Sequence, residues 1–197
     1  GSSGTTLIGK AIAASNWDFF GVSENFSYND NLWAEISGTF NQGTYRKATL
    51  GLGTADTDGL NFYWRKDGVT ASGETIVEYT SKYGDLTDGA NTSVKKGFRH
   101  YVVTLGQDVT VDVYITHMNT YSSSGTGHIN AQHAQLEQLR DYVIEQISVN
   151  KRPAIIMGDT NMRYTRHKLQ EYFIDPINAM EGYSVVDPWV SLAWGYD

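Results

Sequence analysis

Runs of hydrophobic residues separated by polar and glycine-rich segments predict strands along most of the chain. Two of these runs are joined by Gly106-Gln107-Asp108, a connection typical of a β-hairpin. The strands are expected at residues 18–24, 60–65, 76–79, 98–105, 109–117 and 154–157. Residues 25–50 are rich in Asn, Tyr and Gly, and we expect them to be irregular.

Helical periodicity is clearest at residues 131–149, where Leu136, Leu139, Val143 and Ile147 fall on one face. Shorter helices are expected at residues 5–15 and 166–173. Hairpin-connected strands come first, and a helix–strand–helix order follows. This order predicts a mixed α/β (α+β) protein with predominantly antiparallel sheets.

Composition adds the expectation of one globular domain, because 197 residues with 40% hydrophobic and 19% charged residues suffice for a substantial core. Thirteen Tyr and five Trp favour a β-rich protein. The chain has no cysteine, so disulfides give no indication of its redox compartment. No apolar stretch reaches the roughly 18 residues of a transmembrane segment.

The formal net charge is −7, with a pI of about 5.1. This balance argues against a protein that binds nucleic acid through bulk positive charge. It leaves open a nuclease that holds a few phosphates through a metal ion and local arginines.

Candidate chemistry is concentrated where the strand 154–157 ends, at Gly158-Asp159-Thr160-Asn161. The glycine permits a turn, and the carboxylate and amide that follow offer oxygen atoms to one hard cation or one phosphate. The same tetrapeptide is also good turn chemistry, because Asp and Asn bond to their own backbone. Both interpretations stay open for this segment alone.

Two further predicted strands end on polar residues of similar kind, one on Glu24 and the other on Thr116-His117. In isolation, either end is equally explained as a cap or a structural residue. Together with Asp159 and Asn161 they predict one site. Arg163 and Arg166 lie just beyond it and are candidate donors to a substrate phosphate, with surface salt bridges as the alternative.

These segments resemble the endonuclease/exonuclease/phosphatase superfamily, which includes deoxyribonuclease I. Residues 18–24 (DFFGVSE) look like its D-I-I-x-x-Q-E strand, with Ser23 in place of the usual Gln. Thr116-His117 looks like its T-H strand end, and residues 158–161 look like its G-D-x-N signature. Residues 58–61, 96–98 and 163–166 resemble a secreted branch of the superfamily.

The resemblance implies a four-layer α/β/β/α sandwich of the deoxyribonuclease I type, with the site at one mouth of two packed sheets. Glu24 would bind Mg²⁺, or another divalent cation such as Mn²⁺ or Ca²⁺. Asp159 would activate the attacking water, Asn161 would hold the phosphate or the water, and His117 would contact the scissile phosphate. Neutralising phosphate charge and stabilising the leaving oxygen are the demands such a site must meet.

Two motifs of the superfamily are not found: an initial T-x-N strand and a final S-D-H strand. We therefore expect residues 1–197 to form a single domain that is incomplete at both ends. The predicted function is a divalent-metal-dependent phosphoester hydrolase, and the alternative is a catalytically degraded binding or scaffold module of the same fold. The substrate class stays open between nucleic acid, a phospholipid headgroup and a small phosphoester; no protein partner is inferred, and secretion is expected from the branch resembled.

Overall fold

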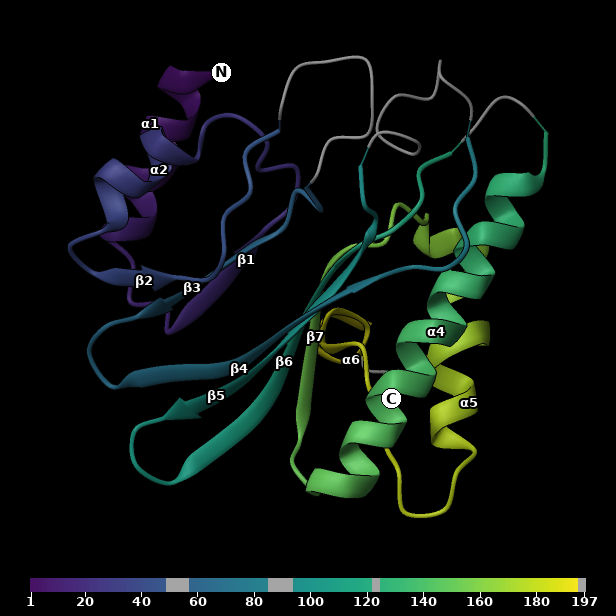
Figure 1. Cartoon of the computed structure of the whole chain (residues 1–197). Helices are drawn as coiled ribbons and strands as arrows, with labels where there is room; N and C mark the ends of the chain where they lie inside the picture. Colours follow the sequence, from purple (N-terminus) through teal and green to yellow (C-terminus); the bar gives the residue numbers. More distant parts are fainter. Residues whose placement is uncertain (49–56, 85–93, 122–124, 195–197) are drawn as a thin grey trace.

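The computed structural model describes residues 1–48, 57–84, 94–121 and 125–194. Two β-sheets form its centre (Figure 1). The first has the order β1-β3-β2 and is antiparallel throughout; its strands are β1 (Phe19–Val22), β2 (Phe40–Gln42) and β3 (Asn61–Arg65). The second has the order β4-β5-β6-β7; its strands are β4 (Val69–Glu78), β5 (Gly97–Leu105), β6 (Val109–His117) and β7 (Ala154–Asp159). Only the β6–β7 pair in this second sheet is parallel.

Helices cover the outer faces of both sheets (Figure 1). Two helices, α1 (Ser2–Ala13) and α2 (Asn29–Ile36), cover the first sheet. The second sheet is covered by α4 (Gly127–Asn150), the π-helical turn η3 (Gln170–Ile174) and α5 (Asp175–Asn178). A 3-10 turn, η2 (Tyr164–Arg166), and a last helix, α6 (Pro188–Trp194), complete the elements. The arrangement is the predicted four-layer α/β/β/α sandwich of mainly antiparallel sheets.

The two sheets pack face to face through aromatic and branched aliphatic side chains. Phe62 of β3 stacks on Tyr101 of β5 with ring centroids 4.4 Å apart. Gly21 of β1 lies over β6, where an added Cβ would meet the Cγ2 atom of Ile115 at 2.8 Å. Any larger residue at position 21 would push the sheets apart, so this glycine sets how closely β1 approaches β6.

The outer layers have separate cores. Phe20 and Tyr63 stack at 4.7 Å beneath α1 and α2, together with buried Leu32 and Ile36 of α2. On the other side, buried residues of α4 pack against the second sheet, and they include three of the four residues whose spacing predicted this helix: Leu136, Leu139 and Val143. In the ranges that the structure describes, no helix has both the length and the apolar character needed to cross a bilayer.

The expected strands and the long helix are confirmed, with three corrections. Residues 25–48 are not irregular throughout, because they contain α2 and β2. The apolar residues of α2 are few but fall at helical spacing on the side that faces the first sheet. Strand β4 is much longer than the predicted residues 76–79, since it pairs with β5 from Val69 onward.

The helix predicted at residues 166–173 is also displaced. Residues 164–166 form a 3-10 turn, and the helical segment that follows continues through η3 and α5 to Asn178. His167 has a left-handed backbone conformation (φ 54°), which separates the two pieces.

Candidate active site

The candidate site is built on neighbouring positions of β5, β6 and β7. His117, the last residue of β6, pairs with Asp159 of β7 on one side and Gly97 of β5 on the other. β6 and β7 are parallel, so both carboxyl ends lie at the same edge of the sheet. The ladder therefore places His117 beside Asp159, as the sequence predicted.

Glu24 reaches this edge from the other sheet. It follows β1 and has a left-handed backbone (φ 58°), and the next residue donates its backbone N–H to the carbonyl oxygen of Gly59 at 2.9 Å. The Glu24 carboxylate is exposed, and its Oε1 atom lies 3.8 Å from Nε2 of His117. Two packed sheets thus bring together Glu24, His117 and Asp159.

Lys96 belongs to this group as well, although sequence analysis assigned it no role beyond its place in a motif. Its side chain is fully buried, and its Nζ atom donates a hydrogen bond to Nε2 of His117 at 2.8 Å. Burial lowers the pKa of Lys96 to about 8, while the nearby carboxylates of Glu24 and Asp159 act in the opposite direction. Below that pH, Lys96 carries a buried positive charge that interacts electrostatically with both carboxylates.

His117 is fully buried and neutral at neutral pH. Burial, followed by the Lys96 charge, lowers the pKa of its imidazole to about 4, against the opposing effect of Asp159 and Asp58. A neutral imidazole has one nitrogen free to accept a hydrogen bond, which is what the Lys96 ammonium requires. The pKa values and the hydrogen bond therefore agree on a cationic lysine that donates to a neutral histidine.

A buried ion pair, Arg99–Asp58, lies in the same region. Arg99 of β5 donates Nε to Oδ2 of Asp58 at 2.7 Å and a terminal nitrogen to Oδ1 of the same carboxylate at 2.8 Å. Both side chains are almost fully buried, and Asp58 further accepts the backbone N–H of Leu60. The bidentate geometry fixes the loop before β3, which carries the Gly59 carbonyl that holds the segment after Glu24.

Asp159 and Asn161 form a turn where β7 ends. The Asp159 side chain is exposed, and its Oδ1 atom accepts the backbone N–H of Asn161 at 2.8 Å. Asn161 has a left-handed backbone (φ 54°), and its side-chain nitrogen donates to the Met118 carbonyl at 2.9 Å. Gly158 has φ 136°, and a Cβ there would lie 2.1 Å from the carbonyl oxygen of Thr116. These contacts hold the turn in place at the end of β7, where Asp159 pairs with His117 in the ladder and the Asn161 side chain is bound to the Met118 carbonyl.

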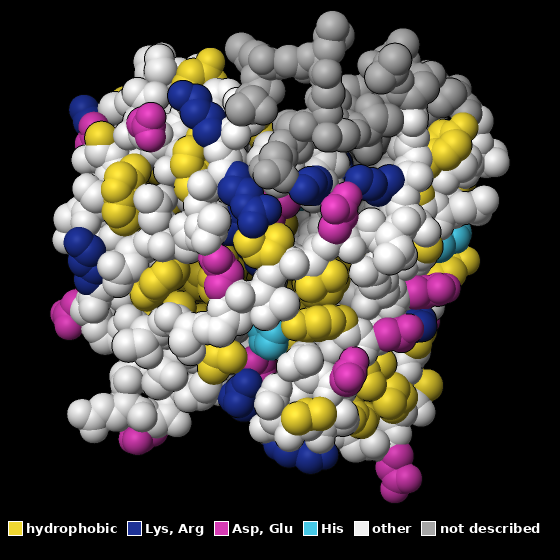
Figure 2. All heavy atoms as spheres, in the orientation of Figure 1, with side chains coloured by type: hydrophobic (Ala, Val, Ile, Leu, Met, Phe, Trp, Pro, Cys, Tyr) yellow, Lys and Arg dark blue, Asp and Glu magenta, His cyan; other side chains and the backbone are white. Residues whose placement is uncertain are grey.

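Arg163 and Arg166 are both exposed and lie beyond the Asp159–Asn161 turn, around a small pocket that Asn161 also lines. Within the described ranges, neither guanidinium has a salt bridge, so the surface salt bridges considered as an alternative are not seen there. Figure 2 shows Lys and Arg side chains in both halves of one face, interspersed with acidic ones.

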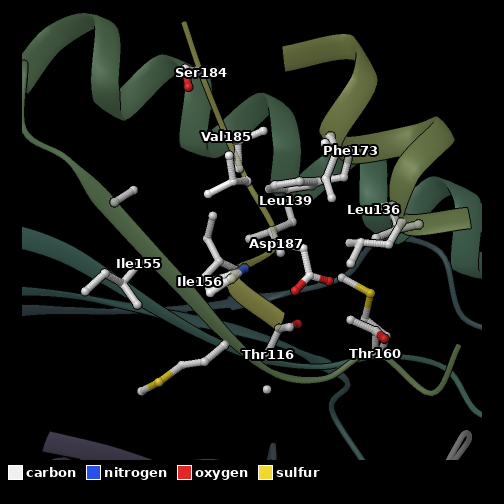
Figure 3. Close-up of a pocket in the computed structure, with 18 residues that line it drawn as sticks. Thr116, Leu136, Leu139, Ile155, Ile156, Thr160, Phe173, Ser184, Val185 and Asp187 are labelled. Carbon is white, nitrogen blue, oxygen red and sulfur yellow. The ribbon is translucent and has the colours of Figure 1, made fainter. Parts of the chain in front are cut away.

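A larger cavity of about 530 Å³ lies between β7, α4 and the segment that precedes α6. It borders the site at Thr116 and Gly158, and its walls are mainly aliphatic and aromatic (Figure 3). The Asp187 carboxylate is among the few polar groups that line it. Its apolar character separates this cavity from the polar edge that carries the candidate chemistry.

A divalent cation would have to be held mainly by Glu24 and Asp159. Among the residues that the structure describes, no group of three or more His, Cys, Asp and Glu side chains is arranged around a common metal position. Mg²⁺ does not require one, because it commonly keeps several waters and binds through one or two carboxylates and the substrate phosphate. The two exposed carboxylates fit that limited demand.

Comparison with solved structures identifies the architecture. A beta toxin variant from Staphylococcus aureus with bound magnesium ions superposes with a TM-score of 0.67 at 19% identity, over 86% of this chain and 62% of that one. Sphingomyelinase C from Streptomyces griseocarneus gives 0.65 at 17% identity, over 85% and 62%. TDP2 from Caenorhabditis elegans gives 0.62 at 12% identity, over 83% and 44%. The chain has the deoxyribonuclease I-like fold.

The resemblance stated from the sequence is thereby confirmed for the fold. This deoxyribonuclease I-like chain spans less than two thirds of the length of each of these neighbours. No family model matches its sequence, and no curated protein matches it. At identities of 12–19% the likeness establishes the fold alone, and the assignment of activity depends on the geometry of the site.

Proposed function

We propose that this deoxyribonuclease I-like chain is a divalent-metal-dependent phosphoester hydrolase. The main support is the arrangement at one edge of the second sheet. The exposed carboxylates of Glu24 and Asp159 lie at this edge, and so does the buried Lys96–His117 pair. Two carboxylates above one buried positive charge form a polar site that can take both a metal ion and an anionic substrate.

Glu24 would hold the divalent cation, with Asp159 next to it and water or substrate oxygen atoms as the remaining ligands. Mg²⁺ is proposed first, and Mn²⁺ or Ca²⁺ as substitutes. When bound, the cation supplies Lewis acidity at a phosphate oxygen and lowers the pKa of a coordinated water. The magnesium-bound beta toxin, a neighbour in fold, supports this choice by analogy.

The Asp159 carboxylate is placed to orient an attacking water and accept its proton. One of its oxygens already accepts the Asn161 N–H, which fixes the orientation of the carboxylate plane. Asn161 is held by the Met118 carbonyl and would position the phosphate or the water. These two residues would therefore share the task of aligning nucleophile and phosphorus.

Lys96 and His117 would act on the transition state from the buried interior of the protein. Because neither side chain is exposed, the Lys96 charge would stabilise the negative charge of the transition state through the low-dielectric interior. His117 accepts the Lys96 hydrogen bond and so fixes the position of that charge. The direct contact between His117 and the scissile phosphate stays a prediction.

The test is hydrolysis of bis-p-nitrophenyl phosphate with and without Mg²⁺, using the chain and its Asp159→Asn variant. The variant keeps an oxygen that can accept the Asn161 N–H but loses the charge, so we expect its folded structure to persist and its turnover to fall by about two to three orders of magnitude. Asp187→Asn, at the apolar cavity, is the matched control. Equal metal-dependent turnover in all three proteins would remove Asp159 from the mechanism.

A binding or scaffold module of the same fold is the second candidate. It is favoured by the Lys96 ammonium, which lies near both carboxylates and partly neutralises them without a metal ion. Calorimetric titration with Mg²⁺ separates the two proposals, because a binding module needs no metal affinity. The substrate, the preferred cation and secretion stay predictions.

A further inference from the structure

The small pocket beside Arg163 and Arg166 is polar, has a volume of about 300 Å³ and adjoins the candidate active site. Its lining residues come from the turns after β6 and β7, the start of α4 and the segment around η2: Tyr121, His128, Gln132, Asn161, Met162, Arg163, Arg166 and Lys168. Asn161 belongs to both the pocket and the active site. The lining contains basic side chains and, within the part of the chain that the structure describes, no Asp or Glu.

The two arginines of this pocket are available to a ligand. Both side chains are exposed, and between residues 1–48, 57–84, 94–121 and 125–194 neither guanidinium has a hydrogen bond or an ion pair. Lys168 donates its Nζ to Oε1 of Gln132 at 2.7 Å. Burial, and then the neighbouring charge of Arg166, lowers the pKa of Lys168. The lining of the pocket therefore carries two guanidinium charges that form no ion pair with a described carboxylate.

The pocket is held at a fixed position relative to the catalytic carboxylate. Gln132 of α4 donates its side-chain nitrogen to the backbone oxygens of Asn119 (2.7 Å) and Asn161 (3.3 Å). The same side chain accepts the Lys168 hydrogen bond. One buried glutamine thus ties α4 to the turns after β6 and β7 and to the basic wall of the pocket.

We propose that this pocket binds a second phosphate group of the substrate, adjacent to the phosphoester that is hydrolysed. The inference rests on the proposed function for the identity of the first phosphate. Guanidinium groups bind phosphate through paired hydrogen bonds, and Arg163 and Arg166 are the groups free to do so. Because the chain is acidic as a whole, this recognition is local rather than a product of bulk charge.

This proposal narrows the class of substrate. A molecule with neighbouring phosphates, such as a nucleotide chain or a phosphorylated headgroup, would place one group at Asp159 and the other in the pocket. A choline headgroup instead carries a quaternary ammonium beyond its single phosphate, and the two arginines would repel it. We therefore expect the substrate preference of this chain to differ from the one that the name of its fold neighbour, sphingomyelinase C, indicates.

Binding of inorganic pyrophosphate, measured by calorimetry without divalent metal, tests the pocket independently of hydrolysis. The variant Arg163→Gln/Arg166→Gln should bind at least about tenfold more weakly than the unmodified chain. The matched control is Lys10→Gln/Lys151→Gly, which removes two positive charges from α1 and from the far end of α4, and it should stay within about twofold. Equal weakening in both variants, or no binding by the unmodified chain at about 1 mM pyrophosphate, would overturn the proposal.

Hydrolysis of matched substrate pairs tests the selectivity. The pairs are thymidylyl-thymidine with and without a 5′-phosphate, and glycerophosphoinositol with and without a phosphate on the ring. In at least one pair, kcat/KM should favour the phosphorylated member about tenfold, and this ratio should fall toward one in the double arginine variant. The pair that shows the preference identifies the source of the second phosphate.

The two assays separate the failure of the inference from the failure of the proposed function. Hydrolysis of all four esters with no increase in kcat/KM from the added phosphate would overturn the proposed phosphate pocket. The proposed hydrolase function would then still hold. Arginine-dependent pyrophosphate binding with no hydrolysis of any ester would support the pocket and overturn the hydrolase.

Discussion

The Lys96 ammonium lies 2.8 Å from Nε2 of His117, and neither side chain is exposed. A buried cation is costly unless hydrogen bonds and opposite charges surround it, and here the imidazole, Glu24 and Asp159 supply both. The pair places a buried positive charge that interacts with the two carboxylates of the candidate site. Several properties of the chain should depend on it.

Replacing Lys96 with Met should lower kcat/KM for bis-p-nitrophenyl phosphate at least about 100-fold, because the site loses its internal positive charge. The melting temperature should hold or rise, since an apolar side chain of similar length removes the cost of burying an ammonium. Lys82→Met, which removes an exposed lysine paired with Glu78, is the control. Turnover within tenfold of the unmodified chain would show that Lys96 is only structural.

The pKa of His117 predicts how stability depends on pH in the metal-free chain. The folded value of about 4 lies below the unfolded value of about 6.5, so the unfolded chain binds the extra proton first. The stabilisation is complete above pH 6.5 and is lost as the pH falls toward 4, by an amount on the order of 3 kcal/mol.

Urea denaturation at several pH values measures this loss. His117→Gln should flatten the dependence between pH 6.5 and 4, while His167→Gln, at an exposed position, should keep it. The same slope in the His117 variant would assign the pH dependence to other groups.

The buried Arg99–Asp58 pair should dominate the stability of the loop before β3. Arg99→Met leaves the Asp58 carboxylate buried without its partner, and the expected loss in the free energy of unfolding is about 3–5 kcal/mol. Glu78→Gln disrupts an exposed pair with Lys82 and should cost within about 0.5 kcal/mol. Comparable losses in the two variants would mean that Asp58 relaxes into solvent.

Glu24→Gln should raise the Mg²⁺ concentration needed for half-maximal hydrolysis at least about tenfold, because the ligand loses its charge while keeping its shape. The backbone at this position is left-handed for either residue, so the fold should not change. Mg²⁺ titration of initial rates is the measurement, with Glu78→Gln as the control. An unchanged half-maximal concentration would remove Glu24 from the metal site.

The sequence predicted much of this fold because alternation and helical spacing reflect burial directly. Residues 98–105 and 109–117 form the expected hairpin, and the predicted face of α4 lies against the sheet. Helix α2 was missed because the tertiary contacts of Leu32 and Ile36, rather than local propensity, stabilise a segment rich in Asn. The length of β4 was missed because its pairing with β5 compensates for a polar sequence.

For the site, the sequence predicted the strand ends but not what lies between them. His117 and Asp159 were predicted to lie in one site because each ends a predicted strand and matches a motif of one superfamily. The structure adds that the two strands are parallel neighbours, which pairs His117 with Asp159. Lys96 carried no such signal, since lysine is rarely fully buried and its hydrogen-bond partner, His117, lies on another strand. The basic pocket likewise requires the turn after β7 to meet the start of α4, which no local pattern encodes.

The parallel pairing of β6 with β7 has a kinetic consequence. Residues 118–153, including the whole of α4, must cross over before Asp159 can align with His117, whereas β5 and β6 meet through a tight hairpin. Closing the longer loop costs more entropy and forms more distant contacts, so it is expected to be slower. During refolding, the sandwich core should gain protection from hydrogen exchange first, and the ability to process substrate should return last.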